Sequence, residues 1–448
     1  MTDPVLLWLR QDLRLHDQPA LIAAAQAGAV IPVYVLDDES PGKWRIGAAQ
    51  RWWLHHSLTA LDAALRAKGS RLILRRGRAV AELEKLAAET GARAIHAIRH
   101  YEPWWVTAEA ALGERLCLSD GNHLTSLRDI TTGSGGRYKV YSAFWRALSE
   151  HMPPADDLPV PRSIAGPEAW PASDRLADWD LLPGKPDWAM GFGTDWTPGE
   201  AEALRKADDF VSEVGDYEAR RDFPGMEATS RLSPHLHFGE ISARTLWHRL
   251  DGAPNAAKFR KEMAWRDFAA SLLVALPDYG EVNGRAAFDR MDWRHSPGDL
   301  EAWRRGRTGY PIVDAGMRQL WATGWMHNRV RMIAASFLVK HLLIDWRAGE
   351  RWFWDTLVDA DYGNNSVNWQ WVAGTGVDSN MWGRIMAPLS QSEKFDAGGY
   401  IREWVPELRG LAEDQIHDPV DRPNGYPEKI IGHREARERA LAAGRRVR

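Results

Sequence analysis

The sequence predicts an α/β domain followed by an all-helical domain, and three observations lead to this expectation. The first 130 residues alternate short apolar runs with Ala-rich amphipathic stretches. Helical periodicity then runs from about residue 198 nearly to the end. At 448 residues, the chain is also too long for one ordinary hydrophobic core. We therefore expect an α/β domain at 1–130, a connector at 131–197 and a helical domain at 198–448.

Five apolar runs in the first part predict strands, and the stretches between them predict helices. The strands are expected at 4–10, 30–36, 70–76, 93–99 and 123–129, with an amphipathic helix at 48–69. Repeated βαβ units form a parallel sheet covered by helices, here with a Rossmann-like topology. The turn after the first strand, RQDLRLHDQP, contains no glycine and so lacks the motif GxGxxG of an ordinary NAD site.

Proline density marks the connector. Residues 152–200 hold nine of the chain's 25 prolines, and helices do not persist at that density. A long segment that crosses the surface is expected there. Beyond it, the pattern at 259–274 predicts one helix, and the charged tail from residue 432 predicts another, solvated one.

Composition places the chain among soluble globular proteins. Hydrophobic residues make up 44% and charged residues 26%, and no apolar run reaches the roughly 18 residues of a membrane span. The N-terminal stretch does not have the pattern of a secretory signal. The single cysteine, Cys117, excludes an internal disulfide and a cysteine-based zinc site. We expect a cytoplasmic protein without membrane association, whose net charge of −4 requires any nucleic-acid binding to use a local basic patch.

Tryptophan is unusually frequent. It occurs 24 times, against 11 Phe and 10 Tyr, and ten of the 24 lie between Trp293 and Trp382. Core packing is the ordinary use of such residues, whereas stacking on a flat ligand or electron transfer is the functional one. Composition alone leaves both open.

The segment 228–240 begins with hydroxyl side chains ahead of an apolar, helical stretch. Thr229, Ser230 and Ser233 at a helix start suit a phosphate, and Arg231 adds positive charge. Ser and Thr at such places most often act as helix caps, so this signal is weak by itself.

Two pairs of candidate metal ligands lack the partners that a metal needs. His235 and His237 have no matching cysteine or carboxylate spacing. Asp359 and Asp361 have no further carboxylate cluster to complete the shell of a hard cation. We predict no metal site.

The predicted helix 259–274 places a carboxylate and an aromatic ring on one face. Glu262 and Trp265 are three residues apart, with Arg266 beside them. These residues form either an exposed Glu–Arg pair next to a packed Trp, or the lining of one pocket.

The stretch from Arg290 to Met332 is basic, with eight Arg against four acids. Trp303, Trp321 and Trp325 are interleaved with them. Arginines among aromatic residues are typical of a surface that grips phosphates and stacks bases, although a solvated charged face is the commoner arrangement.

Two tryptophans in the segment 357–376 point to different neighbours. Trp369 and Trp371 are two apart, which turns the direction by roughly 200° on a helix. We expect them on nearly opposite sides, where at least one serves something other than packing.

Several motifs in order resemble the photolyase/cryptochrome family. They are WLRQDLRLHDQPAL (8–21), TSRLSPHLHFG (229–239), TGYPIVDAGMRQL (308–320), TGWMHNRVRM (323–332) and NWQWVAGTG (368–376). The resemblance covers residue 4 to about residue 410 and is strongest to the cyclobutane pyrimidine dimer photolyases. It implies an N-terminal antenna domain, a long connector and an all-helical domain that binds FAD.

The resemblance also implies a set of cofactor residues. FAD would contact Tyr217, Thr229, Ser230, Arg231, Leu232, Ser233, Phe259, Glu262, Arg266, Asn328, Arg331, Asp359, Asp361 and Asn365. Phe259 stands where the family often has Trp. Asn365 would face flavin N5, where similar plant cryptochromes carry Asp. A neutral amide can hydrogen-bond N5 without supplying a proton, which favours repair over signalling.

By the same resemblance, Trp293, Trp346 and Trp369 form an electron-transfer chain that reduces the flavin, and with Asn365 and Glu262 they are the catalytic residues. The dimer and its DNA would be contacted by Arg221, Glu262, Trp265, Asn328, Met332 and Trp371. Trp265 and Trp371 would flank the dimer, Glu262 would hydrogen-bond its 5′ base, and Arg221 would contact a DNA phosphate.

The expected function is light-driven repair of cyclobutane pyrimidine dimers, by electron transfer from excited reduced FAD to a flipped-out dimer. The expected partner is UV-damaged DNA, bound by a monomer. The alternatives are a blue-light receptor of cryptochrome type and a (6-4) photolyase. An ordinary flavin oxidoreductase would need a nicotinamide site, which nothing in the sequence supports.

Many members of the family bind a second, antenna chromophore in the first domain. The sequence leaves its presence here open and favours a deazaflavin over a folate. Tyr101 and Glu102 are followed by Pro103-Trp104-Trp105, where folate-binding relatives have polar contacts. Of the four tryptophans Trp52, Trp53, Trp104 and Trp105, any could stack on a deazaflavin or fill the pocket itself.

Overall fold

The computed structural model describes residues 3–378 and 382–447. Packing divides the chain into two compact units, each discontinuous in sequence. The first comprises 1–187, 196–215 and 230–277, and the second comprises 188–195, 216–229 and 278–448. Packing units and domains need not coincide, so the domain limits expected at 130 and 197 stay a prediction.

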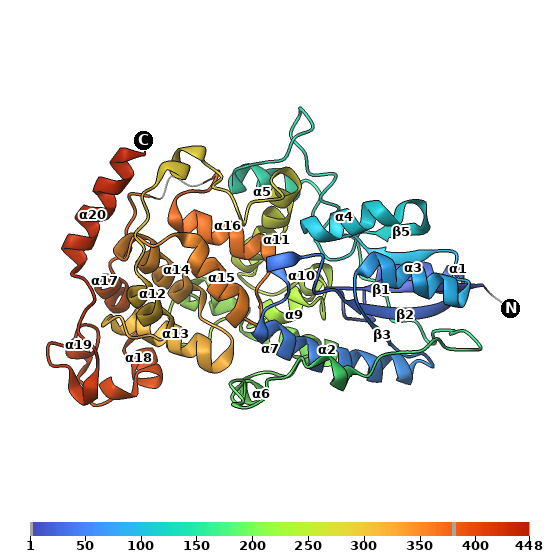
Figure 1. Cartoon of the computed structure of the whole chain (residues 1–448), viewed down its shortest axis with the longest axis horizontal. Helices are drawn as coiled ribbons and strands as arrows, with labels where there is room; N and C mark the ends of the chain where they lie inside the picture. Colours follow the sequence, from blue (N-terminus) through green and yellow to red (C-terminus); the bar gives the residue numbers. More distant parts are fainter. Residues whose placement is uncertain (1–2, 379–381, 448) are drawn as a thin grey trace. The chain divides into compact units, whose positions relative to one another are not determined.

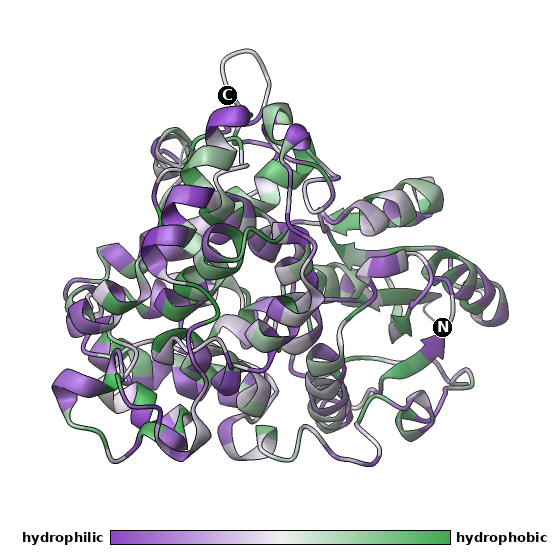
Figure 2. Cartoon of the chain, turned by 60° about the vertical axis from the view of Figure 1, so that its left-hand side comes forward, coloured by the Kyte–Doolittle hydropathy of each residue, from purple (hydrophilic) through white to green (hydrophobic). Residues whose placement is uncertain are grey.

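A five-stranded parallel sheet forms the centre of the first unit, as predicted. Its strands are β1 (Pro4–Leu9), β2 (Ala29–Leu36), β3 (Ile73–Arg76), β4 (Ile95–Ile98) and β5 (Leu116–Ser119). They lie in the order β3-β2-β1-β4-β5, and every neighbouring pair is parallel. Figure 1 shows the strands side by side, and Figure 2 shows that most of their residues are hydrophobic. Such runs are expected of strands that are buried on both faces.

The fifth strand was predicted in the wrong place. It is a short edge strand at Leu116–Ser119, whereas 123–129 forms turns. Leu124 and Leu127 are buried, but the backbone N–H of Leu124 donates to the carboxylate of Asp267 instead of to a neighbouring strand. Because these leucines are buried within turns, the sequence shows the same alternation of apolar and polar residues as a strand.

The helices of the first unit flank the sheet or follow it in sequence. They are α1 (Pro19–Ala27), α2 (Ala48–Ala67), α3 (Ala79–Thr90), α4 (Pro103–Leu112), α5 (Tyr141–Ser149), α7 (Glu200–Glu213), α9 (Ser233–His237), α10 (Ala243–Arg249) and α11 (Ala257–Ala275). Helices α2 and α11 confirm the predictions at 48–69 and 259–274. Helices α3 and α4 share one hydrophobic core with the strands, which includes Trp8, Leu83 and Leu112.

The second unit contains no strand in its described residues. Its helices are α6 (Phe192–Asp195), α8 (Tyr217–Arg220), α12 (Pro297–Arg304), α13 (Pro311–Thr323), α14 (Asn328–Ser336), α15 (Trp346–Thr356), α16 (Tyr362–Ala373), α17 (Pro388–Lys394), α18 (Gly398–Trp404), α19 (Glu413–Ile416) and α20 (His433–Arg446). Helix α14 continues into a π-helical turn at Phe337–His341. Helix α20 confirms the predicted helical tail. Between 152 and 198, the described chain forms short turns, a 3-10 helix at Leu176–Trp179 and the four-residue α6, as its prolines predict.

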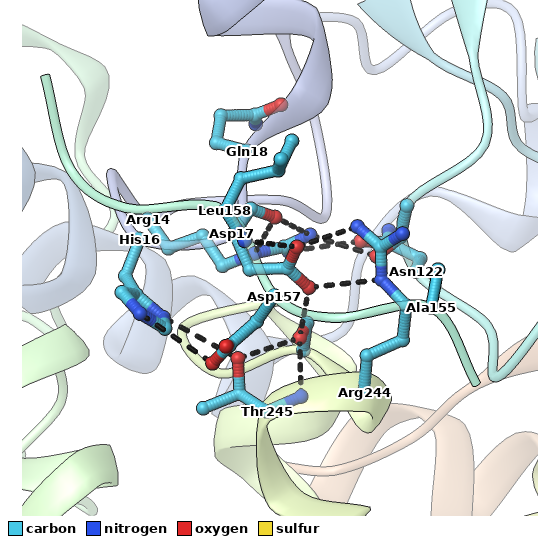
Figure 3. A network of polar contacts seen from close by, with 12 residues as sticks. Arg14, His16, Asp17, Gln18, Asn122, Ala155, Asp157, Leu158, Arg244 and Thr245 are labelled. Atoms are coloured by element: carbon cyan, nitrogen blue, oxygen red, sulfur yellow. Dashed lines mark hydrogen bonds and ion pairs between the residues drawn. The ribbon is translucent and has the colours of Figure 1, made fainter. Parts of the chain in front are cut away.

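A buried arginine ties together distant segments of the first unit. The side chain of Arg14 is 1% exposed and makes five hydrogen bonds. Its guanidinium donates to the carbonyls of Asp17, Gly121 and Gly239 and to the side chain of Asn122. Figure 3 shows Arg14 with Asp17 and Asn122. Every one of these oxygens would be left without this donor if the arginine were lost, which makes the interaction costly to break.

Asp17 extends the same network to helix α10. Its carboxylate accepts hydrogen bonds from Ser242, Arg244 and the backbone N–H of Leu158 (Figure 3). Residues near the start of the chain thereby fix the segment that leads into α10.

We predict that Arg14→Met lowers the free energy of unfolding by about 3–5 kcal/mol, because buried carbonyls lose their donor. Thermal and urea unfolding measure this. Arg66→Met is the control, because the Arg66 side chain is 61% exposed and pairs with Asp62 on its own helix. Its effect should stay within about 0.5 kcal/mol. Equal effects of the two substitutions would contradict the structural role of Arg14.

Candidate functional site

Helix α11 carries four of the predicted site residues, Phe259, Glu262, Trp265 and Arg266. The Trp265 ring is half-buried and lies flat on the Tyr141 ring of α5, with 3.9 Å between ring centroids and 4° between planes. The Tyr141 hydroxyl donates to a backbone carbonyl of α11, 2.5 Å away. One face of the Trp265 ring is therefore covered, and its orientation is fixed.

The two charged residues of this helix have different surroundings. Glu262 pairs with Lys258 at 3.0 Å. Arg266 donates to the backbone carbonyls of Asn122 and Leu236. The structure thus shows no Glu262–Arg266 ion pair among the described residues, and it gives Arg266 a role inside the first unit.

The hydroxyl segment turns sharply into α9. The hydroxyl of Ser230 accepts from the backbone N–H of Leu232 at 3.3 Å. Arg231 has φ 49° in the left-handed region, and its guanidinium lies over the Trp196 ring, 4.4 Å from the centroid. Ser233 is exposed at the first position of α9. Ser230 therefore supports the turn, while Ser233 faces solvent.

The neighbouring histidines are bound within the protein. His235 Nδ1 lies 2.5 Å from Glu240 Oε2, and His237 Nε2 lies 3.1 Å from Gln50 Oε1. Trp53 Nε1 donates to the other Glu240 oxygen at 3.0 Å. These contacts connect the segment to helix α2.

The tryptophans considered for an antenna site differ in burial. Trp53 is fully buried, and its ring stacks on Phe238, with 6.0 Å between centroids and 14° between planes. Trp105 packs edge-on against Trp8. Trp52 packs against His56. The Trp53 ring therefore fills the space around it, which was one of the two uses expected for this residue.

In the second unit, an arginine–aspartate pair joins α14 to the start of α16. Arg331 donates to both Asp359 oxygens, at 3.1 and 2.9 Å, and its Nε donates to the carbonyl of Met326. Asp361 is the N-cap of α16 and accepts from the backbone and side chain of Asn364. Three of the predicted flavin-contacting residues are thus held by charge-assisted or capping hydrogen bonds.

Asn365 lies one turn into α16 and is held by α15. Its Nδ2 donates to the backbone carbonyl of Glu350 at 3.0 Å. The Glu350 side chain is wholly buried, and this burial raises its pKa well above the ordinary value of 4.5. The amide of Asn365 therefore has a fixed orientation, set by the backbone carbonyl of Glu350.

The three tryptophans of the predicted electron-transfer chain occupy linked segments. Trp369 is buried in α16, and its ring lies against Gly349 of α15, where an added Cβ would be 2.2 Å from the ring. Trp346 is the first residue of α15, one turn before Gly349 on the same face, and donates to Asn283 Oδ1 at 3.0 Å. The residue after Trp293, Arg294, donates through its backbone N–H to the carbonyl of Leu343, just before α15.

Trp369 and Trp371 have different environments, as predicted. Trp369 packs edge-on against Phe353 and Trp303 and is 3% exposed, whereas Trp371 is partly exposed. Met332 is also partly exposed on α14. Trp371 and Met332 therefore keep part of their surface accessible, while Trp369 serves the interior.

Arg221 and Tyr217 adjoin a charged cluster of the second unit. The Arg221 guanidinium lies over the Tyr217 ring, 5.0 Å from its centroid. The next residue, Asp222, pairs with Arg329 at 2.6 Å. Asn328, beside Arg329, is exposed at the first position of α14.

The basic stretch 290–332 is less available to phosphates than its composition suggests. Five of its eight arginines form ion pairs with Asp299, Glu301, Glu407, Asp222 or Asp359. Trp303 and Trp325 are buried, which disfavours the stacking of bases on them. Trp321 alone of the three is exposed, at 52%, and it stacks on Trp352.

Three residues of this arrangement escaped the sequence analysis: Tyr141, Gly349 and Glu350. Tyr141 is more than a hundred residues from Trp265, so no local pattern connects the two. Glu350 lies four residues after Trp346 in a helical pattern, and this spacing could have placed it on the same face. The roles predicted for the other site residues stay predictions.

Comparison with known proteins identifies the family. Residues 5–162 match the family described as DNA photolyase, and residues 259–446 match the FAD binding domain of DNA photolyase. A deoxyribodipyrimidine photo-lyase of Agrobacterium fabrum is 48% identical, over 99% of this chain and 98% of that protein. The chain belongs to the photolyase/cryptochrome family, and it carries that family's FAD-binding domain.

Two solved structures share the whole fold. A bacterial class III photolyase from Agrobacterium tumefaciens has a TM-score of 0.95 at 48% identity, covering 100% of this chain and 98% of that one. An archaeal photolyase from Sulfolobus tokodaii, described with two FAD molecules, has a TM-score of 0.85 at 31% identity, covering 99% and 100%. These matches confirm the predicted fold class. None of the described helices is long and apolar enough to cross a membrane.

We predict that Glu350→Gln changes how stability depends on pH. The raised pKa means that the folded protein keeps a proton that the unfolded chain releases, so wild-type stability falls as pH rises above about 4.5 toward the folded pKa. Glutamine cannot titrate. The melting temperature of the variant minus that of the wild type should therefore increase from pH 5 to pH 8.

Glu438→Gln is the matched control, because Glu438 is exposed on α20. Its difference from the wild type should not change with pH in this way. A pH-independent difference for Glu350→Gln would show that its carboxyl does not hold a proton in the folded state.

Proposed function

We propose that the protein repairs cyclobutane pyrimidine dimers in DNA, using light and reduced FAD. The observation that carries this proposal is the Trp265 ring, half-buried and held flat against Tyr141. A fixed aromatic plate with one covered face suits stacking on a pyrimidine ring. The relative from Agrobacterium fabrum, named a deoxyribodipyrimidine photo-lyase, supports the same activity.

Asn365 and the Arg331–Asp359 pair of the second unit fit a flavin. Asn365 uses its Nδ2 on the Glu350 carbonyl, which leaves Oδ1 to accept a hydrogen bond from the N5–H of a reduced flavin. The Arg331–Asp359 pair supplies a fixed dipole for the polar edge of the ring. Bound FAD would supply the photoexcited electron, and Tyr217, Ser230, Arg231 and their neighbours would hold its phosphates and ribitol.

The substrate must leave the DNA duplex to be repaired. Flipping the dimer out costs a few kcal/mol, and less at a damaged, weakly stacked site, which contributes selectivity. Trp265 and Trp371 would stack on the extruded dimer, Glu262 would hydrogen-bond its 5′ base, and Met332 would pack beside it. Arg221 would contact a phosphate of the backbone.

The three tryptophans give the flavin a route for reduction. An electron would pass from Trp369 to the excited flavin, and the resulting hole would move by way of Trp346 to Trp293. The contact of Trp369 with Gly349 and the backbone link from residue 294 to residue 343 support this order.

An antenna chromophore of flavin type in the first unit is part of the proposal, with a deazaflavin favoured over a folate. The archaeal relative described with two FAD molecules supports a flavin-type ring. Trp104 is partly exposed and is therefore a better stacking partner than the buried Trp53. Absorption and mass spectra of the chromophores released from purified protein would identify it, and a released folate would overturn this choice.

The repair activity is tested with an oligonucleotide that contains one thymine dimer. Reduced protein, illuminated with blue to near-UV light, should restore intact thymines, and a dark control should not. A protein that photoreduces its flavin but restores neither this dimer nor a (6-4) lesion would instead be a photoreceptor of cryptochrome type. Restoration of the (6-4) lesion alone would assign the other repair activity.

We predict that Tyr141→Leu weakens binding to dimer-containing DNA, because the Trp265 ring loses its support. Stacking of a base on an aromatic ring contributes about 1–3 kcal/mol, so Trp265→Ala should weaken binding about tenfold or more and Tyr141→Leu by part of that. Tyr141→Phe keeps the stacked ring and should bind normally. Equal affinities of Tyr141→Leu and the wild type would contradict this positioning role.

A further inference from the structure

A positively charged cavity of about 280 Å³ opens beside Trp293 in the second unit. Its lining includes four arginines, Arg290, Arg294, Arg439 and Arg446. Among the described residues that line it, Asp292 is the one carboxylate. The cavity therefore lies at a half-buried tryptophan and carries an excess of positive charge.

Acids offset part of this charge, because Asp292 lines the cavity and Asp299 and Glu435 act on its arginines. Arg294 pairs with Asp299 at 3.2 Å. Arg290 and Arg439 instead donate to the backbone carbonyls of Val447 and His341, which satisfy hydrogen bonds but carry no net charge.

The arginines also repel one another electrostatically. Burial, and next the positive charge of Arg294, lower the pKa of Arg439. Arg446 is exposed at the end of α20. An anion in the cavity would relieve this repulsion and gain several charge-assisted hydrogen bonds.

The size of the cavity favours a small ligand. Pockets for drug-sized ligands measure roughly 300–1,000 Å³, so 280 Å³ suits a small organic anion better than a nucleotide. The adjacent indole indicates what such an anion would do. A tryptophan that gives up an electron must be reduced again before the next turnover.

We propose that the cavity binds a small anionic one-electron reductant of the enediolate class, for which ascorbate is the probe, and that this reductant restores Trp293. This inference rests on the proposed function, in which Trp293 is the outer end of the electron-transfer chain. The surrounding guanidinium groups disfavour a cation radical on Trp293 and thus promote loss of its Nε1 proton to water.

The restoring step balances in electrons and protons. The neutral Trp293 radical takes one electron and one hydroxyl proton from the ascorbate monoanion. The N–H bond of the indole re-forms, the O–H bond of ascorbate breaks, and ascorbate leaves as its radical anion. The charge of the bound species is −1 before and after the step, so the arginines hold it throughout.

The test is the rate of flavin photoreduction in FAD-loaded protein as a function of ascorbate concentration. The wild type should saturate, and Arg290→Gln/Arg446→Gln should need about tenfold more ascorbate, because electrostatic attraction raises local ligand concentration by roughly 10–10³. Both arginines are exposed, so the double variant should fold. With dithiothreitol, which is uncharged at pH 7, the two proteins should have equal rates.

Arg445→Gln is the matched control, because Arg445 is the exposed neighbour of Arg446 on α20 and does not line the cavity. It should respond to ascorbate like the wild type. Equal ascorbate dependence of the double variant and the wild type would overturn the proposal. The proposal would also be overturned if the double variant bound undamaged duplex DNA more weakly while its ascorbate dependence stayed unchanged. The arginines would then contact the phosphate backbone.

Trp293→Phe separates this proposal from the function on which it rests. If Trp293→Phe photoreduces like the wild type, the proposed electron-transfer chain itself is wrong. If Trp293→Phe blocks photoreduction while the double variant behaves like the wild type, the electron-transfer chain is supported and the ascorbate site in the cavity is wrong.

Discussion

Helix α15 lies directly on the ring of Trp369 because residue 349 has no side chain. A Cβ atom there would be 2.2 Å from the ring, a distance that real contacts do not allow. The same helix begins with Trp346, and its next residue after the contact, Glu350, accepts a hydrogen bond from Asn365. One close approach of two helices therefore places two members of the proposed electron-transfer chain and the amide proposed to face the flavin.

The proposed ligand-facing groups are held in the same way throughout. Trp265 is fixed by the ring of Tyr141, Arg331 by both oxygens of Asp359, and the Asn365 amide by a backbone carbonyl. Chemistry that depends on the distance and orientation of aromatic rings needs groups that cannot change rotamer freely. In each unit, a contact with another segment of the chain holds these side chains in one orientation.

Local patterns predicted the fold class well because the strands are strongly apolar and α2 and α11 have clear helical periodicity. The fifth strand was misplaced, because Leu124 and Leu127 are buried in turns that a carboxylate from α11 holds. The support of Trp265 by Tyr141 could not be predicted, since it joins residues far apart in the chain. Similarly, counting arginines in 290–332 overstated the free charge, because partners such as Glu407 lie outside that stretch.

Gly349→Ala tests directly whether the α15–α16 contact sets up electron transfer. Transient absorption after a light pulse would measure the yield of tryptophan radical in FAD-loaded protein, with Ala348→Gly as the control on the same helix. We expect the yield to fall strongly in Gly349→Ala while FAD remains bound, because the added methyl displaces the Trp369 ring. A yield equal to that of the wild type, with FAD bound, would contradict the account.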